Sequence, residues 1–320
     1  MKPPDFWRYG QTPPALLRPL SEITRLITAR RVAKPGFTAP VPVICCGNAG
    51  AGGSGKTPLA LDLATRLRAW GRNPAFLTRG HGGRVRGPAR VASQHTAVDV
   101  GDEALLLAAL APCYVGADRA VTAQLAVANG ADVLLLDDGL QNPSLVKTMS
   151  LLVIDGGAGF GNGWPIPAGP LREPALAAAA RCHAAVLIGE DMAAAGAQLT
   201  YGYPMLHADI VANVDDLAAL PQRIMAFAGI GRPSKFFATL GEFGHTPVET
   251  IEFPDHHHYT QPDLTRIHAR AAALNAVPVT TAKDYVRLAP AERSNIRALR
   301  IALRWHDEAE IDALLTEALQ

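Results

Sequence analysis

The chain has 320 residues, enough for about two domains, and 48% of them are hydrophobic. A charged content of 18% excludes a disordered chain, and a net charge of +1 gives no indication of a nucleic-acid partner. The cysteines lack CxxC spacing, so we expect reduced thiols in the core of a cytosolic protein. No run of about 18 apolar residues predicts a transmembrane helix, and the amino-terminal segment has no apolar signal core.

Residues 15–34 predict a basic amphipathic helix. Leucines and isoleucines recur at helical spacing, arginines follow the other faces, and Phe6 and Trp7 lie just before. Such a helix can lie in a membrane interface, or its apolar stripe can pack on the core of the protein. The residues alone leave both possibilities open.

An apolar run over 41–46 predicts a buried strand, which a glycine-rich segment follows. From Gly50 to Thr57 the spacing is that of a P-loop, and an amphipathic helix is expected over 59–70. Backbone N–H groups of such a loop bind nucleotide phosphates, the lysine reaches the β- and γ-phosphates, and the hydroxyl binds Mg²⁺. The predicted nucleotide-binding residues are Gly50, Ala51, Gly52, Gly53, Ser54, Gly55, Lys56 and Thr57.

Three segments after the P-loop carry charged residues next to predicted strands or helices. Arg79 lies in the glycine-rich segment 78–84, which is either a ligand-binding loop or a solvated one. Asp102 and Glu103 open a predicted helix, where an ordinary N-cap is the first interpretation of Asp102 and a general base the second. Arg119 follows the next predicted strand.

Residues 131–139 are an apolar run that ends in Asp137 and Asp138, a pattern typical of a Walker B strand that delivers a carboxylate to Mg²⁺. We expect Thr57 and Asp138 to hold the ion directly or through water, and Asp137 to share the metal shell or to contact the acceptor. A long glycine- and proline-rich loop over 156–174 carries Arg172. Loops of this length inside a domain are usually functional.

The alternation of strands and helices predicts an α/β fold of the P-loop NTPase type, with a mostly parallel sheet flanked by helices. We expect an amphipathic helical segment over 1–35, a P-loop core over 36–215 and a smaller α/β unit over 216–320. In that unit, His256 begins a run of three histidines. Adjacent side chains diverge, so a partner to a carboxylate or a solvated loop is favoured over a metal site.

Taken together and in this order, the motifs resemble those of the tetraacyldisaccharide 4'-kinase (lipid A 4'-kinase) family over nearly the whole chain. They are FW…LLRPLSEIT, GNAGAGGSGKTP, TRGHGG, VGDE, VGADR, DDGLQ, GNG…PAGPLREP, GIGRPSKFF, FPDHHHYT and TTAKD. The chain departs from the usual family pattern at His81, Ala104, Leu140, Asn142, Arg232 and Ala282.

The resemblance implies transfer of the γ-phosphate of ATP, with Mg²⁺, to the 4'-hydroxyl of tetraacyldisaccharide 1-phosphate, which yields lipid IVA. It places the reaction at the cytoplasmic face of the inner membrane, with no nucleic-acid or obligate protein partner, and favours membrane contact by the amino-terminal helix. Asp102 becomes the expected base and His256 its partner, so the site should lie in a cleft between the two units. The expected substrate-binding candidates are Arg79, Glu103, Arg119 and Arg172.

Two other interpretations fit the sequence less well. A P-loop switch ATPase would carry a second lysine where this chain has Ala51. A kinase or nucleotidase that acts on a soluble small molecule would not need the basic amphipathic segment at the amino terminus.

Overall fold

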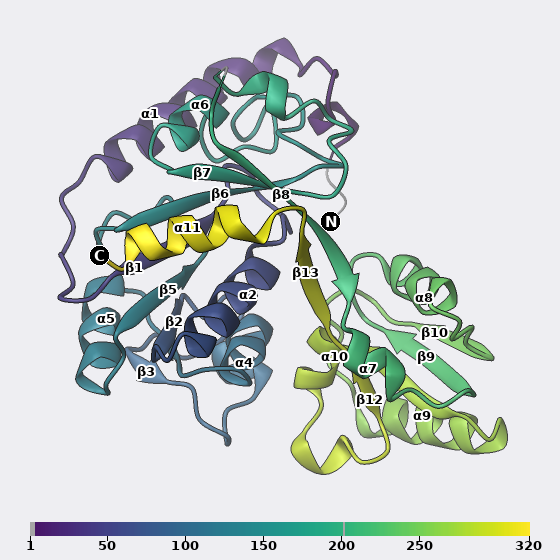
Figure 1. Ribbon diagram of the computed structural model, residues 1–320. Helices are drawn as coiled ribbons and strands as arrows, with labels where there is room; N and C mark the ends of the chain where they lie inside the picture. The colour runs from purple at the N-terminus through teal and green to yellow at the C-terminus, as the bar shows by residue number, and fades with distance from the viewer. Residues whose placement is uncertain (1–3, 201) are drawn as a thin grey trace.

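The computed structural model describes residues 4–200 and 202–320, which form a large and a small α/β unit (Figure 1). The large sheet consists of β1 (Val43–Gly47), β2 (Pro74–Thr78), β3 (Ala89–Arg90), β4 (Cys113–Val115), β5 (Val133–Asp137), β6 (Met149–Asp155), β7 (Ala184–Ile188), β8 (Met205–Ala212) and β13 (Ile301–Trp305). Their order in the sheet is β13-β8-β7-β6-β1-β5-β2-β4-β3. The edge strands β3 and β13 are antiparallel to their neighbours, and the other pairs are parallel.

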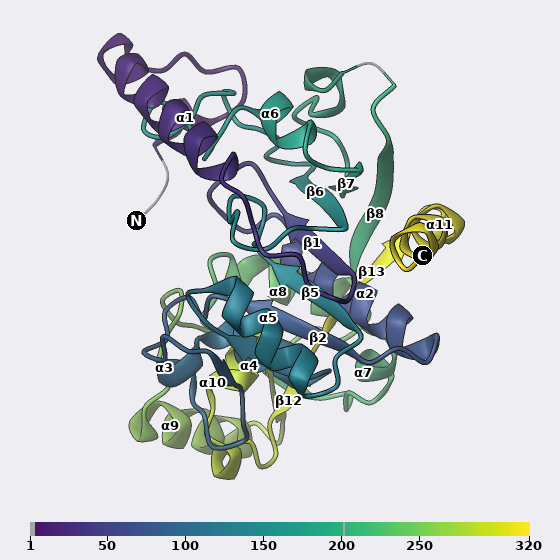
Figure 2. The same ribbon diagram turned by 90° about the vertical axis from the view of Figure 1, so that its left-hand side faces the viewer.

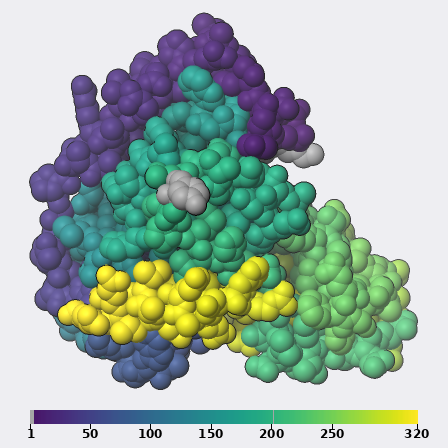
Figure 3. Space-filling view, turned by 45° about the horizontal axis from the view of Figure 1, so that its top comes forward, coloured from purple at the N-terminus to yellow at the C-terminus, as the bar shows by residue number. Residues whose placement is uncertain are grey.

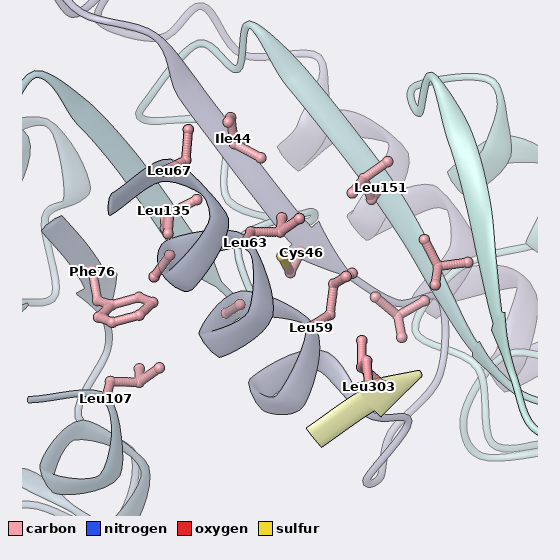
Figure 4. Close-up of a cluster of buried hydrophobic side chains, with 14 of the residues drawn as sticks. Ile44, Cys46, Leu59, Leu63, Leu67, Phe76, Leu107, Leu135, Leu151 and Leu303 are labelled. Atoms are coloured by element: carbon pink, nitrogen blue, oxygen red, sulfur yellow. The ribbon is translucent and has the colours of Figure 1, made fainter. Parts of the chain in front are cut away.

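Helices cover both faces of the large sheet. They are α2 (Lys56–Ala69), α3 (Ala97–Val100), α4 (Asp102–Ala108), α5 (Arg119–Ala128), α6 (Ala175–Ala179) and α11 (Glu308–Ala318). A further helix of this unit, α1 (Arg18–Val32), supplies no described residue to either hydrophobic core of the sheet. Successive side chains of a strand point to opposite faces, so Ile44 and Cys46 pack with α2, α4 and α11, whereas Val43 and Cys45 pack with α5 and α6. Figure 4 shows leucines of α2 directed at the face that carries Ile44 and Cys46.

The small unit has its own parallel sheet of order β10-β9-β11-β12. Its elements are α7 (Val214–Ala218), β9 (Ile224–Ala228), α8 (Pro233–Glu242), β10 (Glu249–Glu252), α9 (Gln261–Ala273), β11 (Val277–Thr281), α10 (Ala282–Arg287) and β12 (Arg297–Leu299). α7 and α8 pack on one face and α9 on the other. The α/β fold with a mostly parallel sheet and a smaller α/β unit, which the sequence predicted, is confirmed.

The end of the chain departs from the expected domain boundary. Sequence reasoning assigned 216–320 to the small unit, but β13 pairs with β8 and α11 packs against α2 in the large unit. Ile311 and Leu315 are fully buried there, because the apolar stripe of α11 covers sheet surface that α2 and α4 leave open. As Figure 1 shows, β8 and β13 together link the two units.

Helix α1 directs its apolar stripe outward. A 3₁₀ turn at Ala15–Leu17 precedes it, so the α-helix is shorter than the expected 15–34. Leu16 is 85% exposed, and the other apolar residues of the stripe, Leu20, Ile23, Leu26 and Ile27, are about half exposed. Packing of this stripe on the core, one of the two possibilities left open by the sequence, is therefore wrong. Figures 2 and 3 show α1 along the outer edge of the large unit.

Polar residues hold α1 in place instead. The Ser21 hydroxyl donates to the Pro165 carbonyl at 2.7 Å, and that of Thr28 donates to the Arg172 carbonyl at 3.0 Å. The helix is thus attached to the 156–174 loop. No helix within the described ranges is long and apolar enough to cross a membrane. Residues 1–3 of the expected segment 1–35 lie outside the described residues.

Candidate active site

The P-loop lies between the carboxyl end of β1 and the start of α2, in the middle of the large sheet. Gly55 has a φ of 90°, and a Cβ there would lie 2.4 Å from Ile188 Cδ1, so only glycine fits. α2 begins directly after it, at Lys56 and not at the expected residue 59. The Lys56 ammonium donates to the Gly52 carbonyl at 3.3 Å, so it lies over the loop that it serves.

Asp137 ends β5, the parallel neighbour of β1, and therefore lies beside the P-loop. The Thr57 hydroxyl donates to its Oδ2 at 3.0 Å, and its buried Oδ1 has no hydrogen-bond partner in the described part of the chain. Burial, with the charge of Glu103 as the next cause, raises the pKa of Asp137 from 3.8 to about 7. The Oδ1 oxygen of this carboxyl could therefore bind a ligand, and a cation beside it would stabilise the ionised form.

Asp138 has a different environment. Burial acts to raise its pKa, but the cations Lys56 and Arg172 outweigh this effect and lower the pKa. Its Oδ1 accepts from Arg172 Nη1 at 2.7 Å and lies 3.9 Å from Lys56 Nζ. The two neighbouring acids are thus distinct: Asp138 is already paired with cations, and Asp137 is not.

The 156–174 loop is attached to the P-loop through backbone hydrogen bonds. Ala51 N donates to the Pro170 carbonyl, and Arg172 N donates to the Ala49 carbonyl. Gln141 connects the same two regions: its amide donates to the Asn48 carbonyl just before the P-loop and to Glu173 Oε1, and its oxygen accepts from Arg172. The loop therefore places a guanidinium beside Asp138.

The other two arginines predicted from the sequence differ in exposure. Arg119 is the first residue of α5 and is only 3% exposed; its Nη1 donates to the Gly116 carbonyl, and its Nε has no partner among the described residues. Burial and then the charge of Arg79 lower the pKa of Arg119 to about 10. Arg79 is exposed and forms no ion pair within the described ranges. A buried cation with a free donor suits an anion.

Asp102 lies at the contact between the two units. It is the first residue of α4, but Gly101 occupies the N-cap position and the Asp102 side chain caps nothing, so the N-cap interpretation is wrong. Its Oδ2 is instead 3.0 Å from His256 Nδ1, in the loop after β10. Beside it, Glu103 lies 3.7 Å from the Lys283 ammonium of the small unit.

The three histidines diverge, as expected for adjacent residues. His256 has a φ of 57° and turns toward Asp102. His257 turns away, where it contacts Asp263 at 3.0 Å and stacks on Phe253, and His258 is exposed. The run thus supplies one side chain to the site and one to the core of the small unit.

Comparison with known proteins identifies the family. A family model described as LpxK, tetraacyldisaccharide-1-P 4'-kinase, matches residues 14–320. The chain belongs to this family. It is 51% identical to the tetraacyldisaccharide 4'-kinase of Gluconacetobacter diazotrophicus over 318 residues, which cover 98% of this chain and 97% of the relative. It is 48% identical to that of Rhodospirillum centenum over 332 residues, which cover 100% and 97%.

A solved LpxK structure agrees with the fold. The crystal structure of LpxK from Aquifex aeolicus in complex with ATP matches with a TM-score of 0.76 and 25% identity, and covers 94% of this chain and 98% of that one. The resemblance found in the sequence is confirmed.

Sequence reasoning missed two residues of this LpxK family member that contact the site. Gln141 joins the P-loop to the 156–174 loop. Arg287, at the end of α10, donates to Asp102 Oδ2 from Nε at 2.7 Å. No spacing rule pointed to either, because their partners are far apart in the chain: Arg287 is 185 residues from Asp102.

Proposed function

We propose that this kinase transfers the γ-phosphate of ATP to the 4'-hydroxyl of tetraacyldisaccharide 1-phosphate and forms lipid IVA in lipid A biosynthesis. Family membership and the ATP complex of the Aquifex aeolicus structure support this assignment. One observation carries the mechanism: charged groups gather at the carboxyl ends of the central strands of the large sheet. They are Lys56 of the P-loop, two acids whose pKa values shift in opposite directions (Asp137 and Asp138), and Asp102 with its partner His256.

The P-loop binds the β- and γ-phosphates through its backbone N–H groups and through the amino-terminal end of α2. Lys56 adds a positive charge near the transferring group. Arg119 and Arg172, the two arginines with buried or paired guanidinium groups, are assigned to the anionic oxygens of ATP or of the acceptor, because a guanidinium donates to two phosphate oxygens at once. Arg79 and Glu103 remain candidates for contacts to the acceptor sugar.

Residues at the start of α2 and at the end of β5 fit a magnesium ion. Thr57 and Asp137 supply oxygen donors, and the buried Oδ1 of Asp137 has no partner in the described residues. Mg²⁺ prefers few protein oxygens and retains waters and phosphates as its other ligands. When bound, it neutralises charge on the β- and γ-phosphates. We assign Thr57 and Asp137 as ligands, whereas sequence reasoning put Asp138 first; Asp138 holds Lys56 and Arg172 in place.

Asp102 acts as the general base. As the 4'-oxygen forms its bond to the γ-phosphorus, the bond from that phosphorus to the β–γ bridging oxygen breaks, ADP leaves, and the hydroxyl proton passes to Asp102. His256 orients the carboxylate through Oδ2. Because the two residues belong to different units, their contact assembles the site from both units.

Helix α1 provides the contact with the membrane that an acylated substrate requires. Its exposed apolar stripe, flanked by arginines, suits the interface of an anionic bilayer. Thr28 ties the helix to Arg172, so the membrane-facing element is attached directly to a loop of the site. We place the enzyme peripherally at the cytoplasmic face of the inner membrane.

The test is transfer of label from γ-labelled ATP to tetraacyldisaccharide 1-phosphate in detergent with Mg²⁺. We expect labelled lipid from the wild type. Lys56→Met should lower kcat/KM at least about 100-fold by removing charge stabilisation, and Asp102→Asn should lower kcat about 100- to 10,000-fold. Asp215→Asn is the matched control, because Asp215 is an exposed acid in the first turn of another short helix, α7.

The outcomes separate the parts of the proposal. Absence of labelled lipid from folded wild-type protein contradicts the reaction. A fully active Asp102→Asn variant leaves the reaction intact and contradicts the assignment of the base.

A further inference from the structure

The Arg287 side chain is only 1% exposed and lies between two carboxylates that belong to different units of the fold. Its Nη1 is 2.8 Å from Asp284 Oδ1, within α10. Its Nε and Nη2 are each 2.7 Å from Asp102 Oδ2, across the contact with α4. A guanidinium is rigid and planar, so the hydrogen bond of one of its nitrogens to Asp284 fixes the directions in which the other nitrogens donate.

The small unit anchors this guanidinium firmly. Asp284 is fully buried and accepts hydrogen bonds from Gly229 N, the Tyr259 hydroxyl and the Thr281 hydroxyl in addition to Arg287. These hydrogen bonds hold the Asp284 carboxylate in one orientation. Contacts within the small unit therefore fix the position of Arg287, independently of Asp102.

Gly229 joins the same anchor to His256. Its carbonyl accepts from Arg287 Nη1 at 2.7 Å and from His256 N at 3.1 Å. A Cβ at residue 229 would lie 3.1–3.2 Å from Pro254 O, the His257 Cβ and Asp284 Oδ1, which is close enough to displace these neighbours. The small unit thus presents Arg287 and His256 together, as one preformed pair of donors.

Both donors use the same oxygen of Asp102. Oδ2 receives Arg287 and His256, whereas no hydrogen bond in residues 4–200 and 202–320 ends on Oδ1. A carboxylate oxygen that accepts two or three hydrogen bonds from fixed donors cannot rotate away. The other oxygen is left to accept the proton of an incoming hydroxyl.

We propose that Arg287 is a second positioning residue for Asp102, beside His256: it holds one carboxylate oxygen across the contact between the units and so directs the other at the acceptor. The inference rests on the proposed role of Asp102 as the base. It assigns to α10 a part in catalysis that requires the small unit to be in contact with the large one.

The experiment compares Arg287→Met and Arg287→Lys with Arg270→Met. Arg270 is the matched control because it is another arginine of the small unit that pairs with a carboxylate, but that carboxylate is Glu249 and not Asp102. We expect Arg287→Met to lower kcat about 10- to 100-fold with the KM for ATP unchanged, because a misdirected base slows transfer without affecting nucleotide binding. Arg270→Met should stay within about twofold of wild type, since it removes an exposed ion pair.

Rescue by the conservative variant gives a second readout. In Arg287→Lys the positive charge remains, but two donors cannot reach Asp102 Oδ2 together. We therefore expect Arg287→Lys to recover only part of the kcat that Arg287→Met loses, whereas a purely structural role would leave kcat unchanged in both folded variants.

Thermal unfolding and a double-mutant cycle decide whether the role is merely structural. If Arg287 acts through Asp102, Arg287→Met should cost little in an Asp102→Asn background. An equal cost in both backgrounds, or a lower melting temperature with kcat unchanged, overturns the proposal. Should Arg287→Met fail to fold, Arg287→Lys at wild-type melting temperature and wild-type kcat overturns it equally. Full activity of the single variant Asp102→Asn refutes a different claim, the assignment of Asp102 as the base, so the two failures can be told apart.

Discussion

The buried carboxyl of Asp137 should make the stability of the protein depend on pH, and Asp137→Asn tests this directly. Its pKa is about 7 in the folded protein against an ordinary 3.8. Below both values the proton is bound in both states and the group contributes nothing. As pH rises from about 4 to about 7, the unfolded chain loses the proton and the folded chain keeps it, so the free energy of unfolding falls.

The size of the effect follows from the two pKa values. Each tenfold change in the acid constant corresponds to about 1.4 kcal/mol, so the change from 3.8 to about 7 amounts to about 4 kcal/mol of lost stability above pH 7. Asparagine does not titrate and can still accept from the Thr57 hydroxyl. In EDTA, Asp137→Asn should therefore gain about 2–3 kcal/mol relative to wild type between pH 5 and pH 8.

The assay is urea unfolding at several pH values with EDTA and with Mg²⁺. Magnesium should stabilise the wild type, and more so at higher pH because it competes with the proton; Asp137→Asn should not respond. Asp138→Asn is the matched control with the opposite sign, because the lowered pKa of Asp138 contributes stability that is present at neutral pH and lost in acid. A constant difference between Asp137→Asn and wild type from pH 5 to pH 8 would refute the reasoning.

Two further substitutions test the exposed stripe of α1 and the strand before the P-loop. Ile23→Glu, on the exposed stripe of α1, should weaken binding to phosphatidylglycerol vesicles at least about tenfold in a sedimentation assay, since it replaces about 1.5–3 kcal/mol of apolar burial by a charge. The control Val214→Glu, at an exposed position of the small unit, should leave vesicle binding unchanged. An equal loss of binding in both variants would contradict the role of α1. Gly47→Ala would place a Cβ 2.5 Å from that of Leu140, so it should cost about 1–3 kcal/mol in thermal unfolding and weaken ATP binding in a nucleotide titration. Unchanged melting and ATP affinity would show that the end of β1 adjusts freely.

The sequence was most informative where a function depends on a local backbone shape. The P-loop needs glycine at Gly55 because of its φ and the nearby Ile188, and that need is visible in the motif itself. The two acids at the end of β5 follow from the same logic, since a parallel strand beside β1 must end next to the P-loop. Sequence reasoning put Asp138 first as a metal ligand, because the opposite pKa shifts of the two acids come from burial and from Lys56 and Arg172, which the local sequence does not record.

By itself, the sequence determined the α/β fold, the nucleotide loop and the candidate pair Asp102 and His256, because short patterns and family motifs carry that information. Only the tertiary structure decided which way α1 faces, that residues 301–320 return to the large unit, and that Arg287 joins Asp284 to Asp102. The physical reason is the same in each case: these features depend on contacts between segments far apart in the chain, and local periodicity does not record which distant surface a side chain meets.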